Sequence, residues 1–196
     1  MIKEKKELTI IDIFYDLKRR VSITRKARIK ASKRLRRKHE FFEKVTNFYS
    51  LIVLILSVWF INYNNLDFTK GLLILSLSLT FFTMFLSSKN YKERAGAFET
   101  NYQHLDVLLN KIERIEVNPI QINTELVKKL HREYEILLIE KENHHDIDYM
   151  TVDEEMASKF KIEIATYRNK EKILNTLIAI YPIILFGFLY FVQKYL

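Results

Sequence analysis

The stretch VTNFYSLIVLILSVWFINY, residues 45–63, decides the fold, because it runs for nineteen residues without a charge. An α-helix rises about 1.5 Å per residue and a bilayer core is about 30 Å thick, so about twenty apolar residues span it. Two further uncharged stretches are GLLILSLSLTFFTMFLSS, residues 71–88, and ILNTLIAIYPIILFGFLYFVQ, residues 173–193. None shows the charged face of a soluble amphipathic helix. We predict a two-span hairpin, residues 45–88, and a C-terminal apolar helix that re-enters the membrane; the alternative for this last helix is an interfacial or protein-buried position.

Composition points to helices throughout the rest of the chain. Only three glycines and two prolines occur among 196 residues, whereas β-rich folds need frequent turns. No cysteine is present, which excludes disulfides and thiolate metal sites. The predicted fold is an all-α membrane protein in which long cytoplasmic helices form a bundle.

The basic residues predict the orientation of this protein in the membrane. Residues 1–44 hold 16 Lys and Arg against 6 Asp and Glu, although the whole chain carries only +8. Basic residues also follow the second span, in the sequence KNYKER of residues 89–94. Lys and Arg concentrate on the cytoplasmic side of membrane spans. We therefore expect a multi-pass protein of the bacterial inner membrane, with residues 1–44 and the helical region 89–172 in the cytoplasm.

The basic segment is patterned as a helix. Ile23, Ala27, Ala31 and Leu35 recur every four residues and form a narrow apolar stripe. The stripe packs either against a helix of the same chain or against a neighbouring protomer. The surrounding cations are predicted to contact anionic lipid headgroups or to mediate assembly; direct nucleic-acid binding is a less favoured alternative. These cations are Arg25, Lys26, Arg28, Lys30, Lys33, Arg34, Arg36, Arg37 and Lys38.

Three helices are predicted within residues 89–172. Apolar residues at spacings of three and four predict a helix over residues 90–116 that extends straight from the second span. Asn123 is a favourable N-cap for a second helix reaching about Glu142. Thr151 and Glu154 have the spacing of a capping box, and a helix from there is expected to continue into the C-terminal span.

No catalytic pattern is visible in the sequence. Phosphate-binding glycine loops and nucleophile elbows are both missing, so no enzyme activity and no cofactor are predicted. The densest polar cluster lies between two predicted helices. A metal site is one interpretation, but adjacent histidines rarely converge on one ion, and a polar capping turn fits better. An intermediate interpretation makes this segment the surface that meets a trigger or partner: Asn143, His144, His145, Asp146, Asp148 and Tyr149.

Hydroxyl side chains form a stripe within the hairpin. In the second span Ser76, Thr80, Thr83 and Ser87 recur at spacings of four, three and four, and in the first span Ser50 and Ser57 are seven apart. Small hydroxyl residues let membrane helices pack closely and hydrogen-bond to one another. The same residues could line a pore made by several copies. The two interpretations are compatible, because one hairpin is too thin to enclose a channel.

The sequence also resembles a known family. The resemblance runs from about Tyr15 to Tyr149 and rests on the basic helix, the hairpin, the stretch YKERAGAFETNYQHLDVLLNKI of residues 91–112 and ENHHDIDY of residues 142–149. These features resemble the SLATT family of bacterial two-span effectors, and most closely the subgroup whose genes adjoin defence reverse transcriptases. The resemblance implies a membrane effector that oligomerises, responds to an upstream sensor and permeabilises the inner membrane of an infected cell.

The expected function is therefore a pore-forming effector of antiviral defence, acting by abortive infection. Its expected partners are membrane lipid, further copies of itself, and an upstream sensor such as a reverse transcriptase or a nucleotide second-messenger system. The alternative is a membrane tether that recruits a cytosolic enzyme or nucleic acid through its basic helix.

Overall fold

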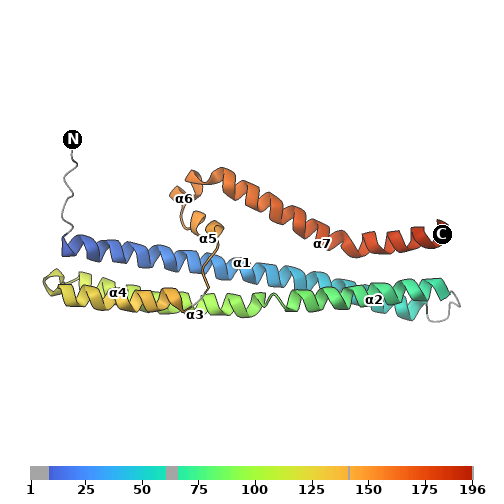
Figure 1. Ribbon diagram of the computed structural model, residues 1–196, viewed down its shortest axis with the longest axis horizontal. Coiled ribbons are helices and arrows are strands. Elements are labelled where there is room, and N and C mark those ends of the chain that lie inside the picture. The colour runs from blue at the N-terminus through green and yellow to red at the C-terminus, as the bar shows by residue number, and fades with distance from the viewer. Residues whose placement is uncertain (1–8, 61–65, 141, 196) are drawn as a thin grey trace. The chain divides into compact units, whose positions relative to one another are not determined.

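A computed structural model describes residues 9–60, 66–140 and 142–195 of the chain. These residues form helices and no strand, which confirms the predicted all-α class (Figure 1). The end of the predicted first span, residues 61–63, lies outside the described residues. Helix α2 begins at Leu66, five residues before the predicted start of the second span at residue 71. The helices are α1 (Ile10–Trp59), α2 (Leu66–Ser87), α3 (Tyr91–Glu116), the 3₁₀ turn η1 (Pro119–Gln121), α4 (Thr124–Ile139), α5 (Asp146–Met150), α6 (Glu154–Lys159) and α7 (Lys161–Tyr195).

The chain divides into two compact units. The first unit comprises Met1–Arg34 and Glu93–Ile164, and the second comprises Leu35–Lys92 and Ala165–Leu196. Helix α1 has no break at the boundary, so residues 10–34 belong to the first unit and residues 35–59 to the second. The three apolar stretches all fall in the second unit.

The start of α1 is fixed by a reciprocal cap. The Thr9 hydroxyl accepts a hydrogen bond from the Asp12 backbone N–H at 3.2 Å, and the Asp12 carboxylate accepts one from the Thr9 backbone N–H at 3.0 Å. Two N–H groups that the first turn of a helix leaves without partners are thereby satisfied.

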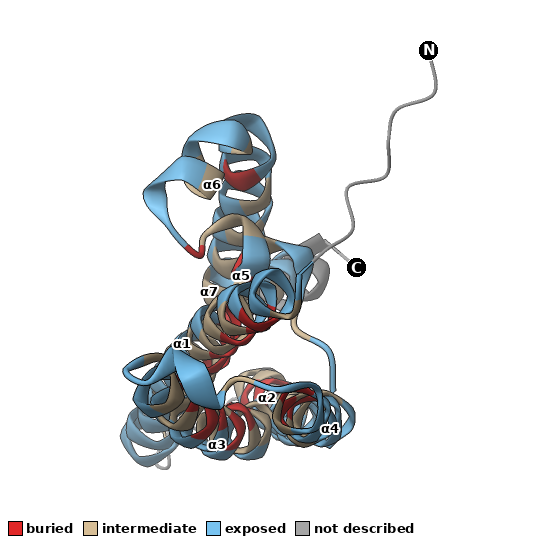
Figure 2. Cartoon of the chain, turned by 90° about the vertical axis from the view of Figure 1, so that its left-hand side faces the viewer, coloured by how far each residue is buried: buried red, intermediate tan, exposed pale blue. Residues whose placement is uncertain are grey.

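The core of the first unit is formed by one face each of α1, α3 and α4. Buried residues lie along α1 and α3, while most of the remaining helix surface is exposed (Figure 2). The spacing of three and four residues predicted for α3 is confirmed at Ala95, Phe98, Leu105, Leu109 and Ile112, which are all buried. The largest buried cluster contains Phe14, Leu17, Val21, Leu105, Leu108, Leu109, Ile112, Val127, Leu130 and Tyr134.

Helices α1 and α3 approach closely because small residues line their contact. Ala27 and Ala31 are fully buried, and the Ser32 hydroxyl donates a hydrogen bond to the Ala95 backbone carbonyl at 3.0 Å. A serine side chain reaches a neighbouring helix backbone only when no larger side chain separates the two. The apolar stripe of the basic segment therefore packs against a helix of its own chain, which is one of the two predicted alternatives.

Enlarging Ala31 should destabilise this contact. Leucine at this position inserts three carbon atoms into a filled interface, and overpacking of this kind costs about 1–3 kcal/mol. We expect Ala31→Leu to lower the thermal unfolding temperature by several degrees and to speed hydrogen exchange in α3. Lys30→Leu, which places the same leucine at an exposed neighbouring position, is the matched control and should leave both unchanged. Equal behaviour of the two variants would contradict the close contact.

Two predicted continuous helices are interrupted. Helix α2 ends before a turn in which Asn90 adopts φ 48°, a left-handed conformation that asparagine tolerates better than most residues. The prediction that the helix of residues 90–116 extends straight from the second span is therefore wrong. The predicted capping box at Thr151 is also wrong. Asp153 caps α6 by accepting from the Met156 N–H at 2.9 Å, and Phe160 separates α6 from α7.

Asn123 behaves as predicted. Its side chain accepts a hydrogen bond from the Leu126 backbone N–H at 2.9 Å and so caps the first turn of α4. Pro119 begins the short turn η1 between α3 and α4.

Candidate functional site

Three described helices are long and apolar enough to cross a membrane, and each includes most of one of the predicted apolar stretches. Most of their apolar side chains are exposed, including Leu54, Leu77 and Phe188. A soluble protein rarely exposes so much contiguous apolar surface. The chain is a membrane protein.

A groove between α1 and α2 is lined by the predicted hydroxyl residues. Its volume is about 460 Å³, and Ser50 and Ser57 of α1 face it together with Ser76, Thr80 and Thr83 of α2. The remaining lining is apolar: Val53, Leu54, Val58 and Leu79. Five of the six hydroxyl residues selected from the sequence therefore lie in one place. The sixth, Ser87, is the last residue of α2 and is not part of the groove lining.

The hydroxyl protons in this groove are largely used within their own helices. Ser57 donates to the Val53 carbonyl at 2.7 Å, Thr80 to the Ser76 carbonyl at 2.9 Å, and Thr83 to the Leu79 carbonyl at 2.8 Å. Each oxygen keeps lone pairs that can accept a further hydrogen bond. The groove thus offers hydrogen-bond acceptors in an otherwise apolar segment.

Helix α7 packs against the hairpin within the second unit. The Tyr49 hydroxyl donates a hydrogen bond to the Ala179 carbonyl at 2.5 Å, and the ring of Tyr181 lies 5.9 Å from that of Phe82. Pro182 lies inside α7 and has no N–H to donate to the preceding turn. A neighbouring helix can compensate for such a loss in a membrane, and the Tyr49 bond supplies a donor to the same turn.

The chain matches a family described as SMODS and SLOG-associating 2TM effector domain family 5, over residues 13–192. The chain belongs to this family. It is therefore a membrane effector domain of conflict systems. No curated protein and no solved structure matches the chain.

In this SLATT chain the predicted cationic surface is divided into exposed and buried residues. Lys26, Lys30, Lys33, Arg36 and Arg37 are exposed on α1. Arg25 pairs with Asp106, and Lys38 pairs with Glu171 at 3.1 Å.

Arg28 is fully buried, the side chain of Arg34 is 12% exposed, and both donate hydrogen bonds to groups of their own chain. Both lie on the side of α1 that carries the apolar stripe. Counting basic residues does not show which of them are on that buried side.

Arg28 holds the C-terminal end of α4. Its guanidinium is fully buried and donates to the Glu142 carbonyl at 2.6 Å and, at 3.5 Å, to the Leu138 carbonyl. It also lies over the Phe98 ring, 5.2 Å from the centroid. Burial lowers the pKa of the Arg28 guanidinium, although Tyr134 and Glu142 oppose this effect. A cation at this position complements the unpaired carbonyls of a helix end.

The predicted trigger segment, residues 143–149, is anchored to α1 through Asp148. The carboxylate of Asp148 is 2% exposed and receives two hydrogen bonds of 2.9 Å from Arg34. It also accepts one from the His145 N–H at 3.1 Å. Just before this segment, the Glu142 side chain accepts from Arg94 at 2.8 Å. Asp148 is thus a structural anchor and is not available as partner surface.

The other residues of the segment remain accessible. Asn143, His145, Asp146 and Tyr149 are exposed, and His144 is half-buried beside the His145 carbonyl. Within the described part of the chain, no group of three His, Asp or Glu side chains could hold a metal ion. Sequence reasoning missed Tyr49, whose partner Ala179 lies 130 residues away. Arg94 lies in the stretch that carries the family resemblance, but its partner Glu142 is 48 residues away and no local pattern connects the two.

Proposed function

We propose that the chain is a pore-forming effector of bacterial antiviral defence, which assembles from several copies and permeabilises the inner membrane. The hydroxyl-lined groove between α1 and α2 carries this proposal. It places polar oxygens along a membrane hairpin whose two apolar stretches, residues 45–63 and 71–88, contain no charged residue. Several hairpins side by side would turn these grooves toward a common water-filled axis, which one hairpin cannot form.

The lining favours cations over anions in this proposal. Ser57, Thr80 and Thr83 donate their protons to helix carbonyls, so their oxygens face the groove as acceptors. Acceptor oxygens replace the hydration of a cation, whereas an anion needs donors.

The orientation and trigger are part of the same proposal. The basic segments before the apolar part of α1 and after α2 favour a cytoplasmic position for the first unit. There the exposed residues of the segment 143–149 can meet an upstream sensor, such as a reverse transcriptase or the product of a second-messenger synthase. Abortive infection would follow when that signal opens the assembled pore.

Removing the groove hydroxyls should suppress ion flow. The variant Ser50→Ala, Ser76→Ala, Thr80→Val, Thr83→Val keeps the shape of the groove but deletes four polar groups. Each hydrogen bond is worth about 1 kcal/mol, so we expect a loss of conductance of more than about tenfold. The measurement is membrane depolarisation in bacteria that express the full chain, followed with a voltage-sensitive dye at equal protein levels in the membrane fraction.

Ser78→Ala is the control, because Ser78 lies on α2 but is not part of the groove lining. It should depolarise cells as the unaltered chain does. If the four-residue variant depolarises cells as fast as the unaltered chain, the groove does not line the pore. A constant membrane potential with the unaltered chain, also in the presence of its genomic neighbours, would contradict pore formation.

The second candidate function is a membrane tether. It is favoured by Lys26, Lys30 and Lys33, which are exposed at spacings of four and three on one helix. Binding of RNA or DNA that weakens steeply with salt, and is lost in a variant with glutamate at all three positions, would support the tether.

A further inference from the structure

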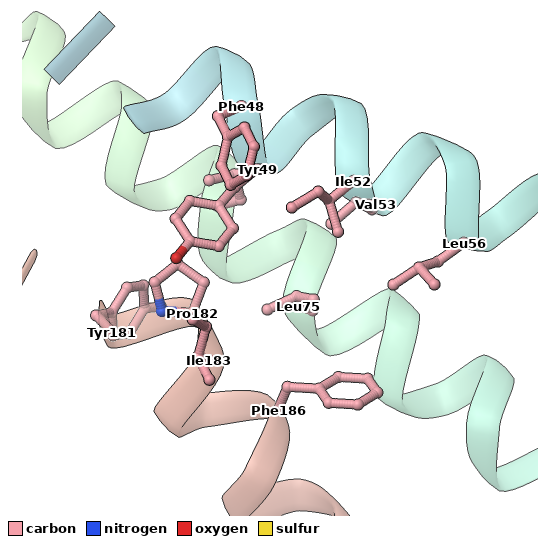
Figure 3. Close-up of a pocket in the computed structure, with 11 residues that line it drawn as sticks. Phe48, Tyr49, Ile52, Val53, Leu56, Leu75, Tyr181, Pro182, Ile183 and Phe186 are labelled. Carbon is pink, nitrogen blue, oxygen red and sulfur yellow. The ribbon is translucent and has the colours of Figure 1, made fainter. Parts of the chain in front are cut away.

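A second cavity lies within the second unit, between α1, α2 and α7. Its volume is about 320 Å³, which is within the range of small-ligand sites. Figure 3 shows side chains of all three helices surrounding this space. The lining residues are Phe48, Tyr49, Ile52, Val53, Leu56, Leu75, Leu79, Tyr181, Pro182, Ile183 and Phe186.

The chemistry of this cavity is almost entirely apolar. No charged, amide or aliphatic hydroxyl side chain lines it, and its polar atoms are confined to two tyrosine hydroxyls and the backbone. The hydroxyl of Tyr49 already donates to the Ala179 carbonyl. A polar ligand would lose its hydration here without gaining hydrogen bonds, so the occupant has to be a hydrocarbon.

The cavity has an exposed edge and a buried inner wall. Phe48 and Ile183 at its edge are 60% and 63% exposed, whereas Leu75 is only 6% exposed. In a membrane the exposed edge is in contact with acyl chains. Hydrocarbon can therefore enter without crossing water, and protein interiors do not leave a space of this size empty.

We propose that this cavity is a binding site for one acyl chain of a membrane phospholipid. Its volume accommodates on the order of ten methylene groups, if each takes about the ~30 Å³ of one liquid water. A neighbouring helix, about 10 Å across, is too wide to enter. The bound chain fills the space between α7 and the hairpin where Pro182 interrupts the hydrogen bonding of α7.

The bound acyl chain also contacts side chains that form a wall of the hydroxyl groove. Val53 and Leu79 line both the apolar cavity and the groove. An acyl chain on one side of this pair keeps it in place on the other. The lipid site itself does not depend on pore formation, and its test uses a readout separate from ion flow.

Photolabelling tests the site directly. The full chain is reconstituted in phosphatidylethanolamine–phosphatidylglycerol nanodiscs that contain phosphatidylcholine with a mid-chain diazirine, and adducts are mapped by mass spectrometry. We expect adducts at Phe186 and Ile52. Leu75→Trp, which fills the cavity, should reduce the adducts at Phe186 by at least about tenfold, because burying even two methylenes is worth that factor.

Leu73→Trp is the matched control, since Leu73 is an exposed residue of the same helix that does not line the cavity. It should leave the labelling of Phe186 unchanged, and adducts at the exposed Phe188 should persist in both variants. If Leu75→Trp does not fold, Ile52→Phe fills less of the cavity and should also reduce the adducts at Phe186. Equal labelling of Phe186 in filled and control variants would overturn the proposal. So would loss of labelling on addition of equimolar oleate, which would assign the site to a free fatty acid, or crosslinks from these residues to a second copy.

Discussion

Asp148→Ala is expected to lower the free energy of unfolding of the first unit by about 3–5 kcal/mol, because it leaves a nearly buried guanidinium without its carboxylate. Arg34 is 12% exposed at its side chain and makes two parallel hydrogen bonds to Asp148. The alanine also removes the acceptor of the His145 N–H, so the first turn of α5 loses its cap. Hydrogen exchange of residues 142–150 should accelerate by two orders of magnitude or more.

The chain contains its own control for this experiment. Asp146 lies two residues earlier in the same turn of α5 but is exposed, and Asp146→Ala should change exchange little. Replacing both partners, with Arg34→Met and Asp148→Leu together, should recover much of the loss, because no charge is then buried alone. If Asp148→Ala and Asp146→Ala exchange alike, the segment is not anchored by this pair.

Arg28→Lys is expected to destabilise the end of α4 strongly at neutral pH, by roughly 1–3 kcal/mol for a carbonyl left without its donor. Lysine has no planar fork, so it cannot reach the Glu142 and Leu138 carbonyls together. Its compact ammonium is also more strongly hydrated, and burial disfavours its charge.

The pH dependence of this variant has a definite sign. Burial already lowers the pKa of Arg28, and it should lower the pKa of a lysine at the same place. The unfolded chain then binds more protons than the folded one between the two pKa values, so stability rises as the pH rises through that window. Urea unfolding at neutral and alkaline pH checks this. Lys30→Arg, an exposed exchange of the same two residue types, should show no such rise. A stability of Arg28→Lys that is constant or falls over this window would contradict burial of the charge.

The sequence was sufficient for the fold class and the groove, because both depend on local periodicity. Uncharged stretches of about twenty residues identify spans, and hydroxyls at spacings of three and four share one helix face. Ser76, Thr80 and Thr83 could therefore be selected together. Ser87 continues the same spacing, but it is the last residue of α2 and does not line the groove. Periodicity shows which face of a helix a residue is on, but it does not show where along the helix the groove ends.

The roles of individual charged residues could not be predicted in the same way. Arg28 and Lys30 are equivalent by composition and only two positions apart, yet one is buried and the other exposed. The difference depends on where α3 and α4 pack, which is a contact between residues more than sixty positions apart. Asp148 was selected as part of a trigger surface, whereas its partner Arg34 lies 114 residues away and no local pattern connects them.

The unbroken course of α1 determines how a signal could travel along this protein. One helix carries Ala27 and Ala31 in the core of the first unit and Ser50 and Ser57 in the groove of the second. A rearrangement in the first unit therefore has a direct path along one hydrogen-bonded helix to the residues of the groove.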